Sequence, residues 1–161
     1  MEYRTLQLAD KDAVEQVLAP LGRNDSALGF ANLYSLTEKY GTEVRLEGRA
    51  LHVRQRRRLP GAVAYYPPLG GEDVVADIAR LLEEAAGAGE RPVLVGVTPS
   101  QRQRLEEALP GMFAFSTDRA FADYLYRTRD IAAYAGPALA KKRRETNKFF
   151  QLYGDDVSFE P

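Results

Sequence analysis

The chain has 161 residues, of which 45 % are hydrophobic and 28 % charged, and its net charge is −1. These totals suit one compact domain with its own core, and they provide no global field to recruit nucleic acid or a membrane, so any anion binding must come from local clusters. The absence of cysteine excludes disulfides, thiolate metal sites and cysteine nucleophiles, and a single histidine, His52, cannot build a histidine-rich metal site.

The N-terminal part of the sequence predicts a strand, two helices and a meander of three strands. Asp10 and Ser26 are placed to cap the two helices, and Gly41 to end the second. Alternating apolar residues and the dipeptide Glu47-Gly48 predict a hairpin within the meander. The expected ranges are 3–8 for the first strand, 11–18 and 27–40 for the helices, and 42–47, 49–54 and 62–66 for the meander.

The next part predicts alternating helices and strands. A helix-period apolar stripe covers residues 74–85, and the apolar run 92–97 is typical of a central strand covered on both faces. Thr98 and Pro99 open a helix that continues to Leu109. Strands are expected at 112–115 and 121–126, a short helix at 129–134, and another strand after Gly154.

Pro137 begins the last helix, and no Gly or Pro interrupts it before Gly154. It carries five cations and one carboxylate between Lys141 and Lys148, a local charge of +4. Four successive cations spread around most of a helix, so we expect its N-terminal half to face solvent or an anion and its aromatic C-terminal half to be docked. The sequence leaves open phosphate contact, a solvated surface, or pairing with the acids of another domain.

Other polar features have simpler interpretations. The basic run Arg54–Arg58 is expected to be a solvent-facing hairpin tip, with a phosphate contact as the alternative. Arg58-Leu59-Pro60-Gly61-Ala62 resembles a pyrophosphate loop, but a strand follows it instead of a helix, so we expect a turn, no acyl-CoA binding and no cofactor. His52 is expected to be an ordinary strand residue, and no nucleophile–base pair is visible.

The order of elements indicates the α/β (α+β) class. It is the order of the GNAT-like N-acyltransferase fold, with a central mixed, mostly antiparallel sheet flanked by helices and, here, a basic C-terminal helix.

One stretch carries a resemblance to a known family. An aromatic strand, a glycine and a basic helix follow one another in a fixed register: Asp123, Tyr124, Tyr126, Thr128, Asp130, Gly136, Lys141, Lys142, Arg143, Asn147, Lys148 and Phe149. This pattern resembles the bacterial phosphatidylglycerol lysyltransferase C-terminal-domain-like family. The residues 26–40 and 65–70 are similar to earlier parts of the same pattern, whereas Pro137-Ala138, Ala140 and Arg144 depart from it.

The resemblance implies two GNAT-like domains in tandem, of which residues 1–135 would be the first and 136–161 the basic helix and the start of a second. It implies the N-terminal domain of an aminoacyl-tRNA-dependent aminoacyltransferase-like protein. The expected partners are tRNA, a phospholipid head group, a second GNAT-like domain or a second copy of the chain. The residues expected to bind substrate are Lys141, Lys142, Arg143, Asn147, Lys148 and Arg127.

The alternatives from this sequence are a non-catalytic interaction domain that docks through the cationic helix and, third, an acyl-CoA N-acyltransferase. No metal is expected. No apolar run approaches the ~18 residues of a membrane-spanning helix, and the first residues lack the apolar segment of a signal peptide. We therefore expect a cytoplasmic protein that can associate peripherally with a membrane.

Overall fold

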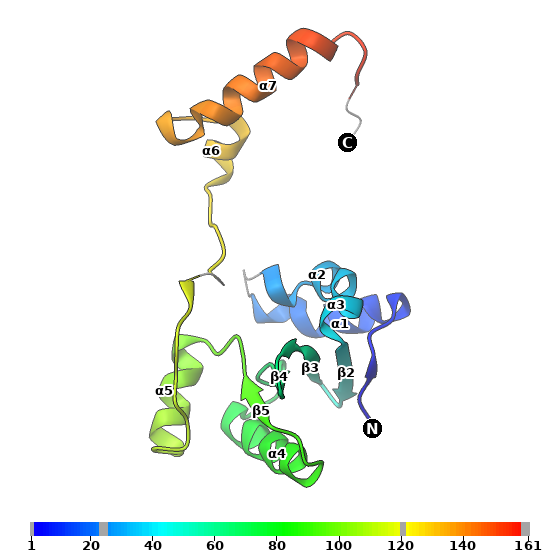
Figure 1. Ribbon diagram of the computed structural model, residues 1–161, viewed down its shortest axis with the longest axis vertical. Helices are drawn as coiled ribbons and strands as arrows, with labels where there is room; N and C mark the ends of the chain where they lie inside the picture. Colours follow the sequence, from blue (N-terminus) through cyan, green and yellow to red (C-terminus); the bar gives the residue numbers. More distant parts are fainter. Residues whose placement is uncertain (1, 23–25, 120–121, 159–161) are drawn as a thin grey trace. The chain divides into compact units, whose positions relative to one another are not determined.

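The computed structural model describes residues 2–22, 26–119 and 122–158, and its elements are labelled in Figure 1. The chain divides into two compact units, Met1–Thr117 and Asp118–Pro161. The first unit contains the sheet and the second contains the basic helix.

The sheet of the first unit has five strands in the order β1-β2-β3-β4-β5. The first four strands pair antiparallel, and β5 pairs parallel to β4. Their bounds are β1 Arg4–Thr5, β2 Thr42–Glu47, β3 Ala50–Leu59, β4 Ala62–Tyr65 and β5 Pro92–Leu94. A mostly antiparallel sheet flanked by helices confirms the predicted fold class and is consistent with a GNAT-like fold.

The hairpin between β2 and β3 forms as the sequence predicts. Glu47 pairs with Ala50, and Gly48 in the turn has φ of 59°, a left-handed conformation that glycine adopts without strain. The strand β3 continues five residues beyond the predicted end at residue 54, because its antiparallel partner β4 extends the ladder to the pair Leu59 and Ala62. The run Pro60-Gly61 that closes this second hairpin is the expected turn.

One face of the sheet packs against the first helices, α1 Lys11–Leu18, α2 Phe30–Ser35 and α3 Thr37–Tyr40. Val44, Leu51 and Val53 point to this face, as their alternation predicts, and all three are buried. The predicted single helix over 27–40 is instead a 3₁₀ turn, Ser26–Leu28, followed by α2 and α3. Gly29, whose ψ of 138° is non-helical, separates the 3₁₀ turn from α2.

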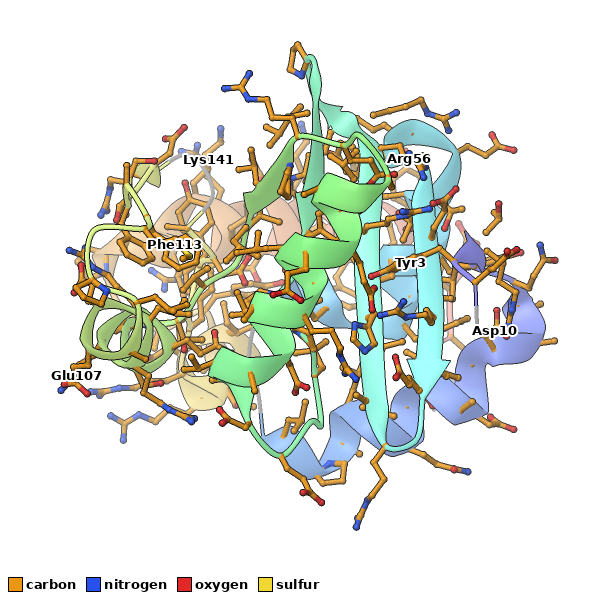
Figure 2. All side chains as sticks on the ribbon, turned by 90° about the horizontal axis from the view of Figure 1, so that it is seen from below. Tyr3, Asp10, Arg56, Glu107, Phe113 and Lys141 are labelled. Atoms are coloured by element: carbon orange, nitrogen blue, oxygen red, sulfur yellow. The ribbon has the colours of Figure 1, made fainter. Side chains whose placement is uncertain are left out.

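The other face of the sheet packs against α4, Val74–Gly87. Figure 2 shows α4 lying across this face, with α1 on the far side of the sheet. Asp73 caps α4 by accepting a hydrogen bond from the Val75 amide at 3.0 Å. Leu81 and Ala85 of α4 pack on Tyr65 of β4, so this layer has a small apolar core of its own.

The prediction that residues 92–97 form a central, doubly covered strand is wrong. β5 has three residues, all half-buried, and among the described residues it pairs with β4 alone. The reason is Gly96, whose φ of 68° turns the backbone out of the extended region. An apolar run alone does not distinguish a central strand from such a short edge strand.

The helix α5, Pro99–Ala108, begins as predicted, because the Thr98 hydroxyl accepts from the Gln101 amide at 3.3 Å and the Gln101 side chain accepts from the Thr98 amide. It buries Leu105, whereas Ala108 is exposed.

The predicted strands at 112–115 and 121–126 are wrong for the residues that the structure describes, and Phe121 lies outside them. The described residues there have no ladder partner, and the side chains of Tyr124 and Leu125 are 87 % and 90 % exposed. Aromatic strand propensity reflects packing on a pleated, half-buried surface, so it forms no strand without a neighbour to pair with.

The second unit contains α6, Thr128–Ala133, the 3₁₀ turn Pro137–Leu139, and α7, Ala140–Tyr153. The short helix expected at 129–134 and the uninterrupted basic helix are confirmed. The described residues after Gly154 form turns rather than the expected strand, and residues 159–161 lie outside the described part of the chain.

Candidate substrate-binding helix

The basic helix begins at a tight corner. The corner contains Tyr134 with φ of 45°, which ends α6, and Gly136 with φ of 80° before Pro137. The Arg143 guanidinium Nη1 donates to the Tyr134 carbonyl at 2.5 Å. Arg143 therefore anchors the first turn of α7 to the end of α6, and this contact uses a carbonyl that the α6 terminus leaves without a helical partner.

The cations of α7 are neutralised unequally. Glu145 is the acid that they contact, and it lies 3.9 Å from the Lys141 ammonium and 3.3 Å from the Lys142 ammonium. Arg144 and Lys148 make no ion pair with a carboxylate in the described part of the chain. Arg143 donates to a neutral carbonyl, so it is not neutralised by an acid either. The side chains of Arg144 and Lys148 are both exposed.

Helical spacing gathers these charges on one side. A shallow surface hollow follows α7 and is lined by Ala140, Arg143, Arg144, Asn147, Lys148 and Gln151. The positions are three or four residues apart, which places them on one face of a helix. This face contains three of the predicted site residues, Arg143, Asn147 and Lys148, whereas Lys141 and Lys142 do not line it.

Two points of the site differ from the sequence prediction. Arg144, set aside because it departs from the family pattern, belongs to the same face, and its i, i+4 spacing to Lys148 was the available signal. Arg127 precedes α6 as its N-terminal cap residue, is exposed, and makes no described side-chain contact with α7. The substrate-binding roles of all these residues stay predictions.

The expectation that the aromatic half of α7 is docked is wrong for the described residues. Phe149, Phe150, Leu152 and Tyr153 are between 45 % and 59 % exposed. The ring of Phe149 packs on those of Phe150 and Tyr153, with centroids 5.6 and 5.5 Å apart, so the rings cover one another only partly.

Comparison with known proteins gives a family and a fold relative. A family model described as "Phosphatidylglycerol lysyltransferase, C-terminal" matches residues 18–158. The chain belongs to this family. No curated protein matches the sequence. A solved structure of a conserved protein of unknown function from Bacteroides thetaiotaomicron is similar to the chain, with 30 % sequence identity and a TM-score of 0.82 over 96 % of this chain and 52 % of that one. The chain thus spans about half the length of that protein.

The second basic cluster of this lysyltransferase-family chain is not free for phosphate. Arg54 and Arg56 both form ion pairs with Glu43 and Glu90, at 2.6 to 3.2 Å. Arg57 donates to the Glu38 carbonyl, and Arg58 donates to the Tyr66 hydroxyl at 2.9 Å. The sequence predicted a solvent-facing hairpin tip. Because β3 is longer than predicted, these arginines belong to the strand itself and contact neighbouring parts of the first unit.

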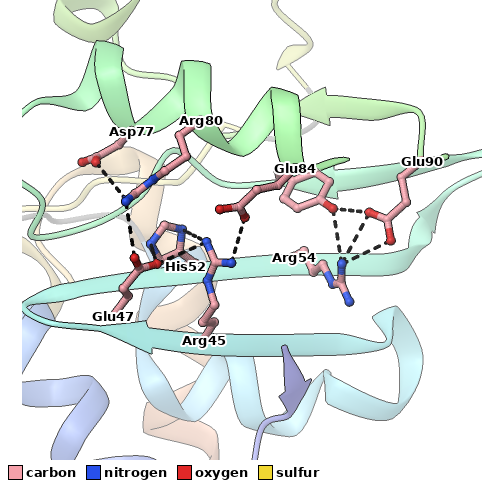
Figure 3. A network of polar contacts seen from close by, with 9 residues as sticks. Arg45, Glu47, His52, Arg54, Asp77, Arg80, Glu84 and Glu90 are labelled. Carbon is pink, nitrogen blue, oxygen red and sulfur yellow. Dashed lines mark hydrogen bonds and ion pairs between the residues drawn. The ribbon is translucent and has the colours of Figure 1, made fainter. Parts of the chain in front are cut away.

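A buried polar network under α4 escaped the sequence analysis. Figure 3 shows Arg45 between His52 and Glu84, and Arg54 beside Glu90. His52 is fully buried, and its Nδ1 lies 3.4 Å from Arg45 Nη2. Burial, followed by the charge of Arg45, lowers the pKa of His52. The signal in the sequence was the polar residue at every second position of β2 and β3, opposite the glutamates of α4.

The described residues offer no cluster of three or more His, Cys, Asp or Glu side chains arranged to hold a metal ion. In that same part of the chain, no helix combines the length and the apolar character that crossing a membrane requires.

Proposed function

We propose that this chain is the GNAT-like, substrate-binding half of an aminoacyl-tRNA-dependent aminoacyltransferase-like protein, and that α7 binds the phosphate backbone of tRNA. The observation that carries the proposal is the pair Arg144 and Lys148, exposed on one face of α7 without an acid partner among the described residues. Membership of the phosphatidylglycerol lysyltransferase C-terminal family supports it.

The chemistry of this face suits a polyanion. An arginine guanidinium offers forked donors to two phosphate oxygens, a lysine adds a point charge, and the Asn147 amide adds a neutral donor. The face presents no nucleophile–base pair, so its role is to bind and orient. A substrate amine or hydroxyl that is held in the right geometry can attack an aminoacyl ester directly.

Titration of the chain with tRNA at several salt concentrations tests this proposal. About four phosphate contacts give a log–log slope near −3 to −4, so affinity should fall about 100-fold between 50 and 200 mM salt. The double variant Arg144→Glu and Lys148→Glu should abolish most binding. The matched control, Lys11→Glu with Arg49→Glu, reverses two exposed charges in the first unit and should bind as the parent does. Binding without a salt slope, or equal loss in both double variants, contradicts the proposal.

An anionic lipid head group presents the same phosphate chemistry. Vesicles of phosphatidylglycerol and of phosphatidylcholine, added in the same assay, separate the two sources. Binding to the anionic vesicles alone, without tRNA binding, would transfer the role of α7 from tRNA to lipid.

A second candidate is a non-catalytic interaction domain, and the exposed aromatic residues of α7 favour it. In this case the helix docks a second domain or another copy of the chain. Reversing Lys141, Lys142 and Arg143 to glutamate, with the assembly state measured by light scattering, discriminates between the candidates. A changed assembly with unchanged tRNA behaviour supports docking.

An acyl-CoA N-acyltransferase is the third candidate. The stretch Arg58–Ala62 runs from the end of β3 through the turn at Pro60-Gly61 to the start of β4. It is not a loop at a helix N-terminus, so amides arranged to hold a pyrophosphate are not expected there. Calorimetry with acetyl-CoA should give no binding isotherm, and a saturable one would favour this candidate.

A further inference from the structure

Two exposed tyrosine rings in the second unit have no role in the proposed function. Tyr124 and Tyr126 lie in the stretch before α6, which belongs to no helix or strand, and their side chains are 87 % and 55 % exposed. Leu125, between them, is 90 % exposed. Three consecutive large apolar side chains in water are unusual outside a binding surface.

The two rings lie nearly parallel. Their planes are inclined by only 16°, and their centroids are 6.4 Å apart. This separation is close to the rise of about 6.6 Å over two residues of extended chain, so the backbone spacing accounts for it. Rings in full face-to-face contact would be about 3.5 Å apart, so these two cover one another only partly. Most of each ring face is therefore open to another planar group.

The aromatic cluster at the end of α7 has a different geometry. Phe149 meets Phe150 at 81° and Tyr153 at 46°, so these rings cross one another. Crossed rings present edges as well as faces and form an irregular apolar surface, whereas parallel rings present flat faces to a partner. The arrangement of Tyr124 and Tyr126 thus favours a flat aromatic partner.

A cation directly follows the two rings. Arg127 is exposed, and its guanidinium makes no hydrogen bond or ion pair with a described residue. Arg129, the next cation, lies 3.6 Å from Asp130 and is paired. Surfaces that bind single-stranded nucleic acid combine exposed rings, on which bases stack, with cations that contact the phosphates. The stretch therefore has both parts of such a surface.

Unpaired bases fit these rings better than a duplex does. In a duplex each base is stacked between its neighbours and its faces are covered, whereas the bases of loops and single-stranded ends can stack on aromatic side chains. Two rings on alternate residues can accept successive bases of one strand.

We infer that Tyr124 and Tyr126 stack on unpaired bases of the RNA whose phosphates α7 binds, and that Arg127 contacts the adjoining backbone. The inference rests on the proposed function and adds to it a contact of a different kind. Stacking releases no counterions, so its contribution does not depend on salt, unlike that of the α7 cations.

A single-stranded RNA and a blunt duplex, titrated with the chain at several salt concentrations, separate the two contacts. A strand of about twelve uridylates is within the usual site sizes for single strands, and a duplex offers phosphates without free bases. Tyr124→Ala with Tyr126→Ala should weaken single-strand binding by at least about fivefold. The affinity for the duplex should stay as in the parent, and so should the salt slope for both RNAs.

Two controls show whether the rings themselves are responsible. Tyr124→Phe with Tyr126→Phe keeps both rings and should bind the single strand as the parent does. Leu125→Ala removes an exposed apolar side chain from between the rings without removing a ring, and it should also bind as the parent does. In the parent, the ring-proton resonances of these two tyrosines should move upfield when the single strand is added, because a stacked base shields them.

An equal loss of affinity for single strand and duplex in the alanine variant would overturn the inference. An equal loss in Leu125→Ala would do so too, since it would indicate a general apolar contact in place of stacking. Failure of the proposed role of α7 gives a different result, in which Arg144→Glu with Lys148→Glu leaves the salt slope for both RNAs as in the parent. Failure of the parent to bind either RNA would contradict both.

Discussion

Acidification should destabilise the first unit through its single histidine. The guanidinium of Arg45 can only donate, so His52 Nδ1, which lies 3.4 Å from it, must accept, and the neutral ring carries its proton on Nε2. Protonating Nδ1 would turn this hydrogen bond into a contact between two donors. The nearest carboxylate oxygen, on Glu47, is 3.8 Å from Nε2 and offers little compensation.

The loss of stability follows from the lowering of the His52 pKa. The folded-state pKa of His52 lies below its ordinary value of 6.5 because of burial and Arg45, with Arg80 adding to the repulsion and Glu47 and Glu84 opposing it. At a pH between the folded-state and unfolded-state pKa values of His52, the unfolded chain binds a proton at this residue and the folded chain does not. Stability is therefore complete above about pH 7 and falls by up to about 1.4 kcal/mol for each pH unit below ~6.5, until the folded pKa is reached.

Urea unfolding between pH 5 and 8, followed by circular dichroism, measures this loss. The chain has one histidine, and carboxylates titrate mainly below this window, so the slope between pH 5 and 6.5 belongs to His52. His52→Gln provides a control with a polar group that does not titrate. Whatever its free energy of unfolding at pH 8, that value should stay constant over the same window. Parallel pH profiles for the two proteins would refute the reasoning.

Three further predictions concern the backbone, a surface pair and the basic helix. Gly70→Ala should lower the free energy of unfolding by about 2 to 5 kcal/mol, because φ is 77° and a Cβ would lie 2.6 Å from a backbone oxygen. Gly48 is also at positive φ but has nothing within 4 Å of the added Cβ, so Gly48→Ala should lower this free energy by only about 1 to 2 kcal/mol in the same urea assay. Asp10→Asn should lower the free energy of unfolding by about 1 kcal/mol at neutral pH. Hydrogen bonds from the Arg4 guanidinium lower the pKa of Asp10, so the difference from the parent should vanish as the pH falls through that lowered pKa. A difference that persists at pH 2 contradicts this. Arg144→Ala with Lys148→Ala should reduce the salt slope of tRNA binding by about 1.4 to 1.8, and an unchanged slope would exclude phosphate contacts by these two residues.

Local sequence signals predicted the elements that local chemistry determines. The helix start at Thr98 and Pro99, the turn at Gly48 and the apolar stripe of α4 each depend on residues that are close in the sequence, and each forms as expected. Elements that depend on distant partners were predicted less well. The strand β3 is longer than its own pattern indicates because β4 pairs with it, and β5 is shorter because Gly96 turns the chain.

The buried network shows the same limit for a site. His52 lies between Leu51 and Val53 in β3, so alternation puts it on the opposite face, but alternation does not tell what covers that face. The covering helix α4 brings Glu84 to Arg45 across 39 positions of sequence. Such a pairing can be identified only once the positions of the sheet and the helix are known. The same is true of the lowered pKa of the His52 imidazole, which depends on this burial.

The contrast between α7 and the stretch 122–126 has the same physical origin. A helix satisfies its backbone hydrogen bonds within itself, so α7 forms although almost all its side chains are exposed. A strand cannot, and among the described residues the exposed rings of Tyr124 and Tyr126 stack on each other alone, with centroids 6.4 Å apart. If a partner edge pairs with this stretch, amide hydrogen exchange should slow at residues 122–126 and remain unchanged along α7. Protection of both would indicate instead that the partner covers the whole unit.

The placement of the positive charge left on α7 depends on which cations its one carboxylate contacts. One glutamate in a helix reaches residues three and four positions away, and Glu145 therefore engages Lys142 and Lys141. Arg144 is its immediate neighbour, about 100° around the axis and out of its reach. Lys148, three positions after Glu145, is within that reach, but Glu145 contacts the two lysines that precede it. Moving the acid to position 151, by Glu145→Ala with Gln151→Glu, keeps the net charge but places a carboxylate among the residues that line the hollow, to which Glu145 does not belong. The tRNA affinity of this variant should fall although its charge is unchanged, and equal affinity would mean that net charge, not its placement, controls binding.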